Sequence, residues 1–220
     1  MTFGIRKIPR NAALLIGLLI LIVSSPSASG RGAYFVMELM FDLILVAGVY
    51  AIGLSRQRWA FAALTVLTLA IRWGEILPGS EGFDVLALGF TAAWLAYAAW
   101  ITIAELFQRR DVTLNMILGA VVTYLLVAVA FMMTFQLLEL ANPGAFSGLS
   151  AGVHEDPRKL AGSMLYFSLV CLTTMGFGDI APLSDLARSL SVLEGVFGQL
   201  YLAVMIARLV GLHITRSTSD

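Results

Sequence analysis

The hydrophobic pattern of this 220-residue chain consists of long apolar stretches separated by short polar linkers. Six of the stretches are long, and they cover about residues 8–25, 33–54, 59–77, 83–107, 112–140 and 184–210. Because the hydrocarbon core of a bilayer is about 30 Å thick, a helix that crosses it needs roughly 20 predominantly apolar residues. The pattern therefore predicts an all-α transmembrane protein with six membrane-spanning helices.

A seventh apolar stretch, residues 160–173, lies between the fifth and sixth predicted spans. It is too short to cross a bilayer, and its length is typical of a helix that enters the membrane and returns to the same side. We therefore expect a re-entrant helix at roughly 160–172.

Composition supports a membrane protein and argues against several other classes. The chain is 59% hydrophobic and 13% charged, whereas soluble domains are about 45–50% apolar and about 25% charged. The 14 basic and 14 acidic residues balance, so we expect no nucleic-acid partner. Cys171 is the single cysteine, which excludes an intrachain disulfide and a multi-cysteine metal site. No hydrolytic or redox constellation stands out, so we expect neither an enzyme nor a cofactor.

Basic residues are concentrated in alternate linkers, which predicts the orientation of the chain. They precede the first span and occupy the second and fourth linkers: Arg6, Lys7, Arg10, Arg56, Arg58, Arg109 and Arg110. By the positive-inside rule these segments face the cytoplasm, and six crossings place both termini there as well. Acidic residues collect on the outer side: Glu81, Asp84, Glu139, Glu155, Asp156, Asp179 and Asp185. A negative outer face suits the mouth of a cation path.

Residues 1–30 have a second interpretation. Basic residues, the apolar run 12–23 and the small residues 27–30 also fit a cleavable signal peptide. The topology of the remaining chain is the same whether this segment is a retained helix or a removed leader.

Two glycines separated by one residue, Gly176 and Gly178, follow the re-entrant stretch. Glycine adopts positive φ at little steric cost, so alternating glycines let a short strand point successive carbonyls to one side. Non-helical backbone at membrane depth is tolerated only where it is buried in protein or lines a water-filled path. This segment is therefore predicted to be a loop whose main-chain oxygens replace the hydration shell of an ion.

Residues 173–179, Thr-Thr-Met-Gly-Phe-Gly-Asp, resemble the selectivity filter of potassium channels. Met175 stands where that family usually has Val or Ile, and Phe177 where Tyr is commonest. Both positions contribute main-chain oxygens, so neither departure removes an ion ligand. Phe177 lacks a hydroxyl that could tether the filter from behind, which bears on inactivation and on the strictness of selectivity.

The resemblance assigns the ion path to five consecutive residues: Thr174, Met175, Gly176, Phe177 and Gly178. It implies K⁺ as the permeant ion, bound at the first four of them. Thr174 is expected to offer both its carbonyl and its hydroxyl at the inner mouth of the filter. Just before the filter, Tyr166 is expected to donate a hydrogen bond to Asp179.

In the last span the resemblance implies a hinge and a cavity lining. Gly198 occupies the position of the gating glycine, although a small residue there equally suits close helix packing. Gln199, Leu202 and Ile206 match positions that line the central cavity. For Gln199 the alternative is a hydrogen bond between helices.

Ionisable residues within the predicted membrane are costly and need partners or water. Glu38 and Asp42 share a face near the outer end of the second span, and Arg72 and Glu75 lie near the outer end of the third. They predict a salt-bridge cluster, with a sensor or ligand pocket as the alternative. Glu194, about ten residues into the last span, could bond to groups behind the filter.

Two features bear on gating. The fourth span contains no Lys or Arg, whereas a voltage sensor needs several at every third position, so the sequence does not predict voltage gating of that kind. His154 could titrate near neutral pH, but its place in an outer loop is typical of a solvated histidine. The gating ligand or stimulus is not evident.

Together these features predict a K⁺-selective channel subunit of a prokaryotic cell membrane. Residues 1–110 form a four-helix domain, residues 111–212 the pore domain and residues 213–220 a short cytoplasmic tail. One chain supplies one filter strand, so the expected partners are three further copies, in a homotetramer, and the lipid bilayer. The resemblance also favours a retained first helix. Two alternatives remain: a weakly selective cation channel, and a membrane receptor or binding module whose N-terminal helices gate the pore.

Overall fold

The computed structural model describes residues 10–24, 42, 45, 57–74, 83–108, 112–150, 152–154 and 156–217. The helices are α1 (Arg10–Ser24), α3 (Gln57–Gly74), α4 (Phe83–Gln108), α5 (Leu114–Ala141), α6 (Pro157–Leu172) and α7 (Asp185–Ser217). Two short strands, β1 (Phe146–Ser147) and β2 (Ala181–Pro182), form an antiparallel pair. The described chain is therefore all-α apart from this small ribbon.

Three described segments are long and apolar enough to cross a membrane: Leu88–Gln108, Leu114–Ala141 and Asp185–Leu212. They belong to the fourth, fifth and sixth apolar stretches of the sequence. The apolar parts of α1 and α3 are shorter, and residues 33–54, apart from Asp42 and Leu45, lie outside the described chain. The count of six spans stays a prediction.

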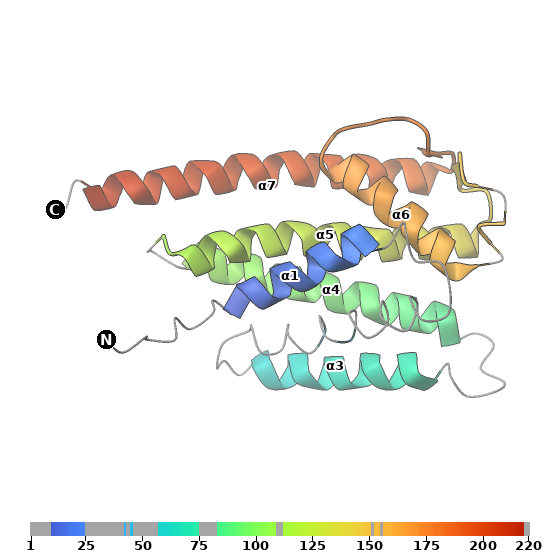
Figure 1. The fold of residues 1–220 in the computed structure, drawn as a ribbon, viewed down its shortest axis with the longest axis horizontal. Helices are drawn as coiled ribbons and strands as arrows, with labels where there is room; N and C mark the ends of the chain where they lie inside the picture. The colour runs from blue at the N-terminus through green and yellow to red at the C-terminus, as the bar shows by residue number, and fades with distance from the viewer. Residues whose placement is uncertain are drawn as a thin grey trace.

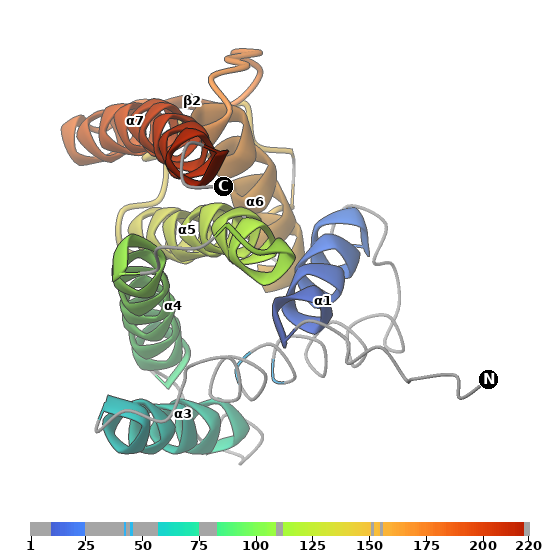
Figure 2. The ribbon, with the colours of Figure 1, turned by 90° about the vertical axis from the view of Figure 1, so that its left-hand side faces the viewer.

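The helices are arranged in successive layers. Figures 1 and 2 show α7, α5, α4 and α3 following one another across the molecule, with α1 against the side of α5. The shorter helix α6 packs against both α5 and α7 near one end of the bundle. The N-terminal end of α1 and the C-terminal end of α7 both point to the opposite end (Figure 1).

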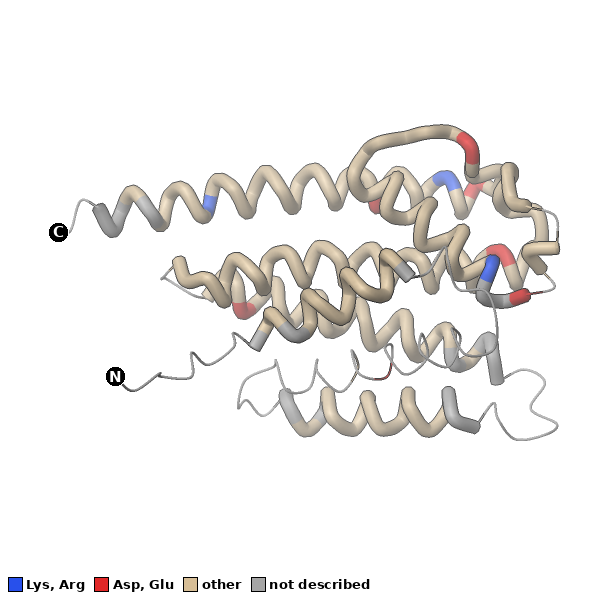
Figure 3. The backbone as a smooth tube through the Cα atoms, in the orientation of Figure 1, with Lys and Arg blue, Asp and Glu red and all other residues tan. Residues whose placement is uncertain are grey.

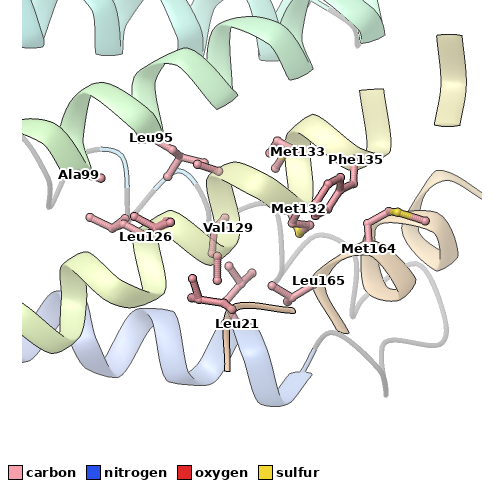
Figure 4. Packing of buried hydrophobic residues seen from close by; sticks show 14 of the residues in the cluster. Leu21, Leu95, Ala99, Leu126, Val129, Met132, Met133, Phe135, Met164 and Leu165 are labelled. Carbon is pink, nitrogen blue, oxygen red and sulfur yellow. The ribbon is translucent and has the colours of Figure 1, made fainter. Parts of the chain in front are cut away.

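Helix α5 is the centre of the core because it is apolar all round, which is typical of a buried helix. It begins after Thr113, whose hydroxyl accepts a hydrogen bond from the N–H of Met116 and so caps the helix. Its side chains pack against α1, α4, α6 and α7. Figure 4 shows part of this core, with labelled residues from four helices: Leu21, Leu95, Leu126, Val129, Met132, Phe135 and Leu165.

Helix α1 is joined to α5 by polar contacts as well as by apolar packing. The side-chain amide of Asn11 donates to the carbonyl of Asn115 over 2.8 Å, and its main-chain N–H donates to the Asn115 side chain over 3.2 Å. Leu14, Leu18 and Leu21 then bury their side chains in the shared core. The first apolar stretch is thus part of the packed helical assembly.

Charged residues of the described chain are distributed unevenly along the bundle. Figure 3 shows acidic residues gathered at the end that carries the loop after α6. The predicted basic linkers lie largely outside the described residues. Basic residues lie at this end as well (Figure 3), and its orientation toward the outside stays a prediction.

Candidate functional site

The site is built on the C-terminal end of α6. The N–H of Met175 donates to the carbonyl of Val170, and the N–H of Thr174 donates to the carbonyl of Cys171, each over 3.0 Å. These are the two hydrogen bonds of a Schellman motif, whose residue after the cap adopts the left-handed conformation and is usually glycine. Here that residue is Thr174, with φ of 58°. The end of the helix thus sets the conformation of the first filter residue.

The loop that follows alternates in backbone conformation. Thr174, Gly176 and Gly178 have φ of 58°, 60° and 77°, while Met175 and Phe177 between them do not have positive φ. Such alternation is what turns successive carbonyls to the same side of a strand. Thr174 is the sole non-glycine residue with positive φ in the described chain, and its residue type does not predict this conformation.

Residues 173–179 are exposed along their whole length in the single chain. Met175 and Phe177 each leave 64% of their surface uncovered. Apolar side chains this exposed at the expected depth of a membrane must face lipid or another protein surface.

Behind the loop, Tyr166 of α6 contacts two filter residues. Its hydroxyl forms a side-chain hydrogen bond with Asp179, so the pairing expected from the resemblance is present. Its ring also stacks on Phe177, with ring centroids 6.4 Å apart and planes 5° apart. Tyr166 therefore supports both the middle and the outer end of the loop from one side.

The segment after α5 contacts the outer end of the loop directly. Strand β1 pairs with β2, placing Phe146 opposite Pro182 and Ser147 opposite Ala181. The next residue, Gly148, has φ of 80°, and a Cβ placed there would lie 1.8 Å from the carbonyl oxygen of Asp179. Only glycine fits this position, because both the backbone conformation and the close approach exclude a side chain.

Glu139, at the end of α5, holds this segment in place. Its side chain is 1% exposed, and its two oxygens accept hydrogen bonds from the N–H groups of Gly144 (2.8 Å) and Phe146 (3.0 Å). His154 also lies close, with Nε2 3.2 Å from Oε1 of Glu139. The His154 side chain is half-exposed, as expected of a solvated histidine, and it also contacts this buried carboxylate.

Helix α7 approaches the end of α6 closely at Gly198. A Cβ there would lie 2.2 Å from the carbonyl oxygen of Leu172, which already accepts a hydrogen bond from the hydroxyl of Tyr124 over 2.9 Å. Helix α7 is continuous through this position. The geometry is that of close helix packing, while a hinge at Gly198 stays a prediction.

The next residue, Gln199, reaches the filter. Its side-chain amide donates to Oγ1 of Thr174, a loop residue, over 3.0 Å. Cavity lining and a hydrogen bond between helices both stay predictions. Leu202 and Ile206 follow on α7 and are 41% and 61% exposed. Both side chains are uncovered in the single chain, and their place in a cavity stays a prediction.

Glu194 joins three helices behind the filter. Its side chain is fully buried, and Oε1 lies 2.5 Å from the hydroxyl of Ser168 on α6. The same hydroxyl lies 2.7 Å from the carbonyl of Ala128 on α5. Because Glu194 has no exposed surface in the single chain, its contacts are with the packed helices around it.

Near the opposite end of α7, Arg208 contacts the end of α4. Its guanidinium donates to the carbonyls of Leu106 (3.1 Å) and Phe107 (2.7 Å) and lies 5.1 Å from the centre of the Phe107 ring. Cationic side chains often satisfy the last carbonyls of a helix in this way. Arg208 thus links the pore-lining helix to the N-terminal helices.

The predicted membrane charge cluster falls mostly outside what the structure describes. Glu38, Glu75 and the side chain of Arg72 are not among the described residues, and Asp42 is half-buried. Among the residues that were placed, no group of three or more His, Cys, Asp or Glu side chains could hold a metal ion.

Comparison with known proteins agrees with this geometry. A family model described as "Ion channel" matches residues 112–213. The voltage-gated delayed rectifier potassium channel KCNH5 of Homo sapiens is 30% identical over 190 residues, covering 78% of this chain and 17% of the relative. The inward rectifier potassium channel Kirbac3.1 of Paramagnetospirillum magnetotacticum is 32% identical over 98 residues, covering 44% of this chain and 28% of the relative.

The chain therefore spans less than a third of the length of either relative. No solved structure matches. The matched segment begins just before α5 and ends within α7, so it contains the re-entrant helix, the filter loop and the ribbon described above. Residues 112–213 thus match the ion channel family, and both of these relatives are potassium channels.

Proposed function

We propose that four copies of this chain assemble around an axis into a channel that conducts K⁺ passively and selectively. The ion path is lined by main-chain oxygens of Thr174, Met175, Gly176 and Phe177, with the hydroxyl of Thr174 at its inner end. The observation that carries the proposal is the alternation of positive φ at residues 174, 176 and 178 in an exposed loop. Carbonyls aligned in this way can replace the hydration shell of a cation.

The exposed surfaces support assembly of several copies. One loop offers oxygens from one side only, and a ring of four is needed to surround an ion. Large apolar side chains are uncovered along α7, on several of its faces: Val192, Leu193, Val196, Leu200, Leu202, Val204, Ile206 and Val210. In a cyclic tetramer some of these positions pack against neighbouring copies, some line the cavity and the rest face lipid.

Electrostatics favour a cation at both ends of the path. The C-terminal end of α6, which carries a partial negative charge, lies directly beside Thr174. At the outer end, Asp179 and Asp185 add formal negative charge. The basic linkers are expected on the cytoplasmic side, and this polarity supports an orientation with the acidic end outside the cell and both termini inside.

A substitution at Gly176 tests the proposed path. No atom of the same chain lies within 4 Å of a Cβ placed there, so within one copy Gly176→Ala acts by disfavouring positive φ, at about 1–2 kcal/mol. We expect wild-type protein in liposomes to pass K⁺ in preference to Na⁺, and Gly176→Ala to lose conduction or selectivity.

Gly89→Ala, in α4 with equally free space and no positive φ, is the matched control and should behave as wild type. Equal K⁺ and Na⁺ flux through wild-type protein would support the weakly selective alternative. An unchanged Gly176→Ala flux would refute the assignment of the filter.

A further inference from the structure

Thr173 and Thr174 lie side by side at the end of α6, but their hydroxyls have different partners. Oγ1 of Thr173 donates to the carbonyl of Leu169, one helical turn back, over 2.6 Å. Oγ1 of Thr174 instead accepts from the side-chain amide of Gln199 on α7, over 3.0 Å. The first hydroxyl is therefore engaged by its own helix, and the second is engaged by the pore-lining helix.

The conformation of Thr174 indicates that its side chain is needed. Its position in the Schellman motif normally holds glycine, and a β-branched residue with φ of 58° is strained. Glycine at residue 174 would remove that strain and would also remove the hydroxyl. The presence of threonine in this conformation points to a function for Oγ1.

Helix packing brings Gln199 within reach of that hydroxyl. The preceding residue, Gly198, allows α7 to approach the carbonyl of Leu172 so closely that a Cβ would lie 2.2 Å from it. Both Gln199 and Thr174 are exposed in the single chain, so their hydrogen bond lies on the open surface and not in the core.

A hydroxyl can serve as a cation ligand only if a lone pair faces the ion. A free threonine hydroxyl rotates, and it can turn its proton toward a nearby carbonyl as that of Thr173 does. When the amide of Gln199 donates to Oγ1, one lone pair is occupied and the orientation of the group is restricted. The remaining lone pair is then held in a limited range of directions.

We propose that Gln199 is a positioning residue that orients the hydroxyl of Thr174 and thereby sets the affinity of the innermost site for a partly dehydrated alkali cation. In a tetramer the four amides form a ring directly below the filter. This inference rests on the proposed function, because it takes Thr174 to be an ion ligand.

The test uses the full-length tetramer in planar bilayers, with K⁺ varied on the side of the α7 C-terminus. We expect Gln199→Ala to raise the half-saturating K⁺ concentration by about threefold to tenfold, the effect of losing one neutral hydrogen bond per site. Gln199→Leu, which keeps a side chain of similar size and removes the donating amide, should raise it as well. Because the Gln199 side chain is exposed, neither variant should prevent folding.

Coupling to Thr174 separates positioning from a general structural effect. In a Thr174→Val background the hydroxyl is absent, so Gln199→Ala should have no further effect on the half-saturating concentration. In a Thr174→Ser background the hydroxyl remains, and the effect of Gln199→Ala should persist.

Equal half-saturating concentrations for Gln199→Ala and wild type would overturn the inference, as would a full effect in the Thr174→Val background. A change in the thermal stability of the tetramer alone would also overturn it. These outcomes differ from failure of the proposed function, which would show as absent or unselective K⁺ current in the wild-type protein.

Discussion

Gly148 tests whether the segment after α5 controls the outer end of the filter. It lies 30 residues before Gly178 in the sequence, yet a Cβ placed there would lie 1.8 Å from the carbonyl oxygen of Asp179. We predict that Gly148→Ala impairs selectivity although this residue contributes nothing to the ion path.

The magnitude follows from two contributions. Alanine with φ of 80° costs about 1–2 kcal/mol. In addition, a normal contact distance of 3.4 Å requires the two backbones to separate by about 1.6 Å. Such a displacement is large enough to break the hydrogen bond of Asp179 to Tyr166 and the two-residue pairing of β1 with β2.

Gly144→Ala is the matched control for this prediction. Gly144 lies in the same segment with φ of 91°, but nothing lies within 4 Å of a Cβ placed there. Both variants therefore carry the backbone penalty, and only Gly148→Ala displaces Asp179.

The assay is K⁺ and Na⁺ flux from liposomes, together with thermal unfolding. We expect both variants to unfold at lower temperature and Gly148→Ala alone to lower the K⁺/Na⁺ flux ratio, by about fivefold or more for one lost hydrogen bond. Equal K⁺/Na⁺ flux ratios for the two variants would refute the idea that this segment positions the outer end of the filter.

Three further predictions concern the contacts behind the pore. Tyr166→Phe keeps the ring stack on Phe177 and loses the hydroxyl bonded to Asp179. We therefore expect the K⁺ current to decay faster while the thermal stability is unchanged. A current identical to that of the wild type would contradict this. Glu194→Ala removes a buried partner of Ser168 and should lower the free energy of unfolding by about 1–3 kcal/mol. Glu194→Gln should be closer to wild type in thermal unfolding. An equal loss of stability in both variants would show that the hydrogen bond is unimportant. Arg208→Ala leaves two carbonyls at the end of α4 without their cationic donor. Amide hydrogen exchange in the last turn of α4 should therefore accelerate. Unchanged exchange there would indicate that this contact does not stabilise the helix end.

Much of the fold could be predicted from the sequence because it depends on local apolar periodicity. The re-entrant helix was expected at roughly 160–172, and α6 is Pro157–Leu172. Long helices were expected on both sides of it, and α5 and α7 are present. Helices α1 and α3 cover most of the first and third apolar stretches, and the remaining residues of those stretches lie outside the described chain.

The filter loop was predictable in its glycines but not in its first residue. Gly176 and Gly178 indicate positive φ by their residue type alone. The left-handed conformation of Thr174 follows from the way α6 ends, and threonine has no intrinsic preference for it.

The contacts that hold the filter loop in place could not be predicted from the sequence. From the sequence, Glu139 and His154 were assigned only to the outer face. In the structure Glu139 binds the turn at Gly144 and contacts His154, and β1, which follows this turn, pairs with β2 after the filter. The contacts of Glu139 and His154 are themselves local, but the link to the filter depends on the pairing of Phe146 with Pro182 and of Ser147 with Ala181. Gly148 likewise looks like an ordinary loop glycine until its distance to Asp179 is known.

The central claim is that main-chain oxygens of residues 174–177 select K⁺. The most direct measurement is the reversal potential of the reconstituted wild-type channel with K⁺ on one side of the bilayer and Na⁺ on the other. The account predicts a reversal potential far from zero, in the direction that shows K⁺ to be much more permeant. A reversal potential near zero, with current clearly present, would contradict it.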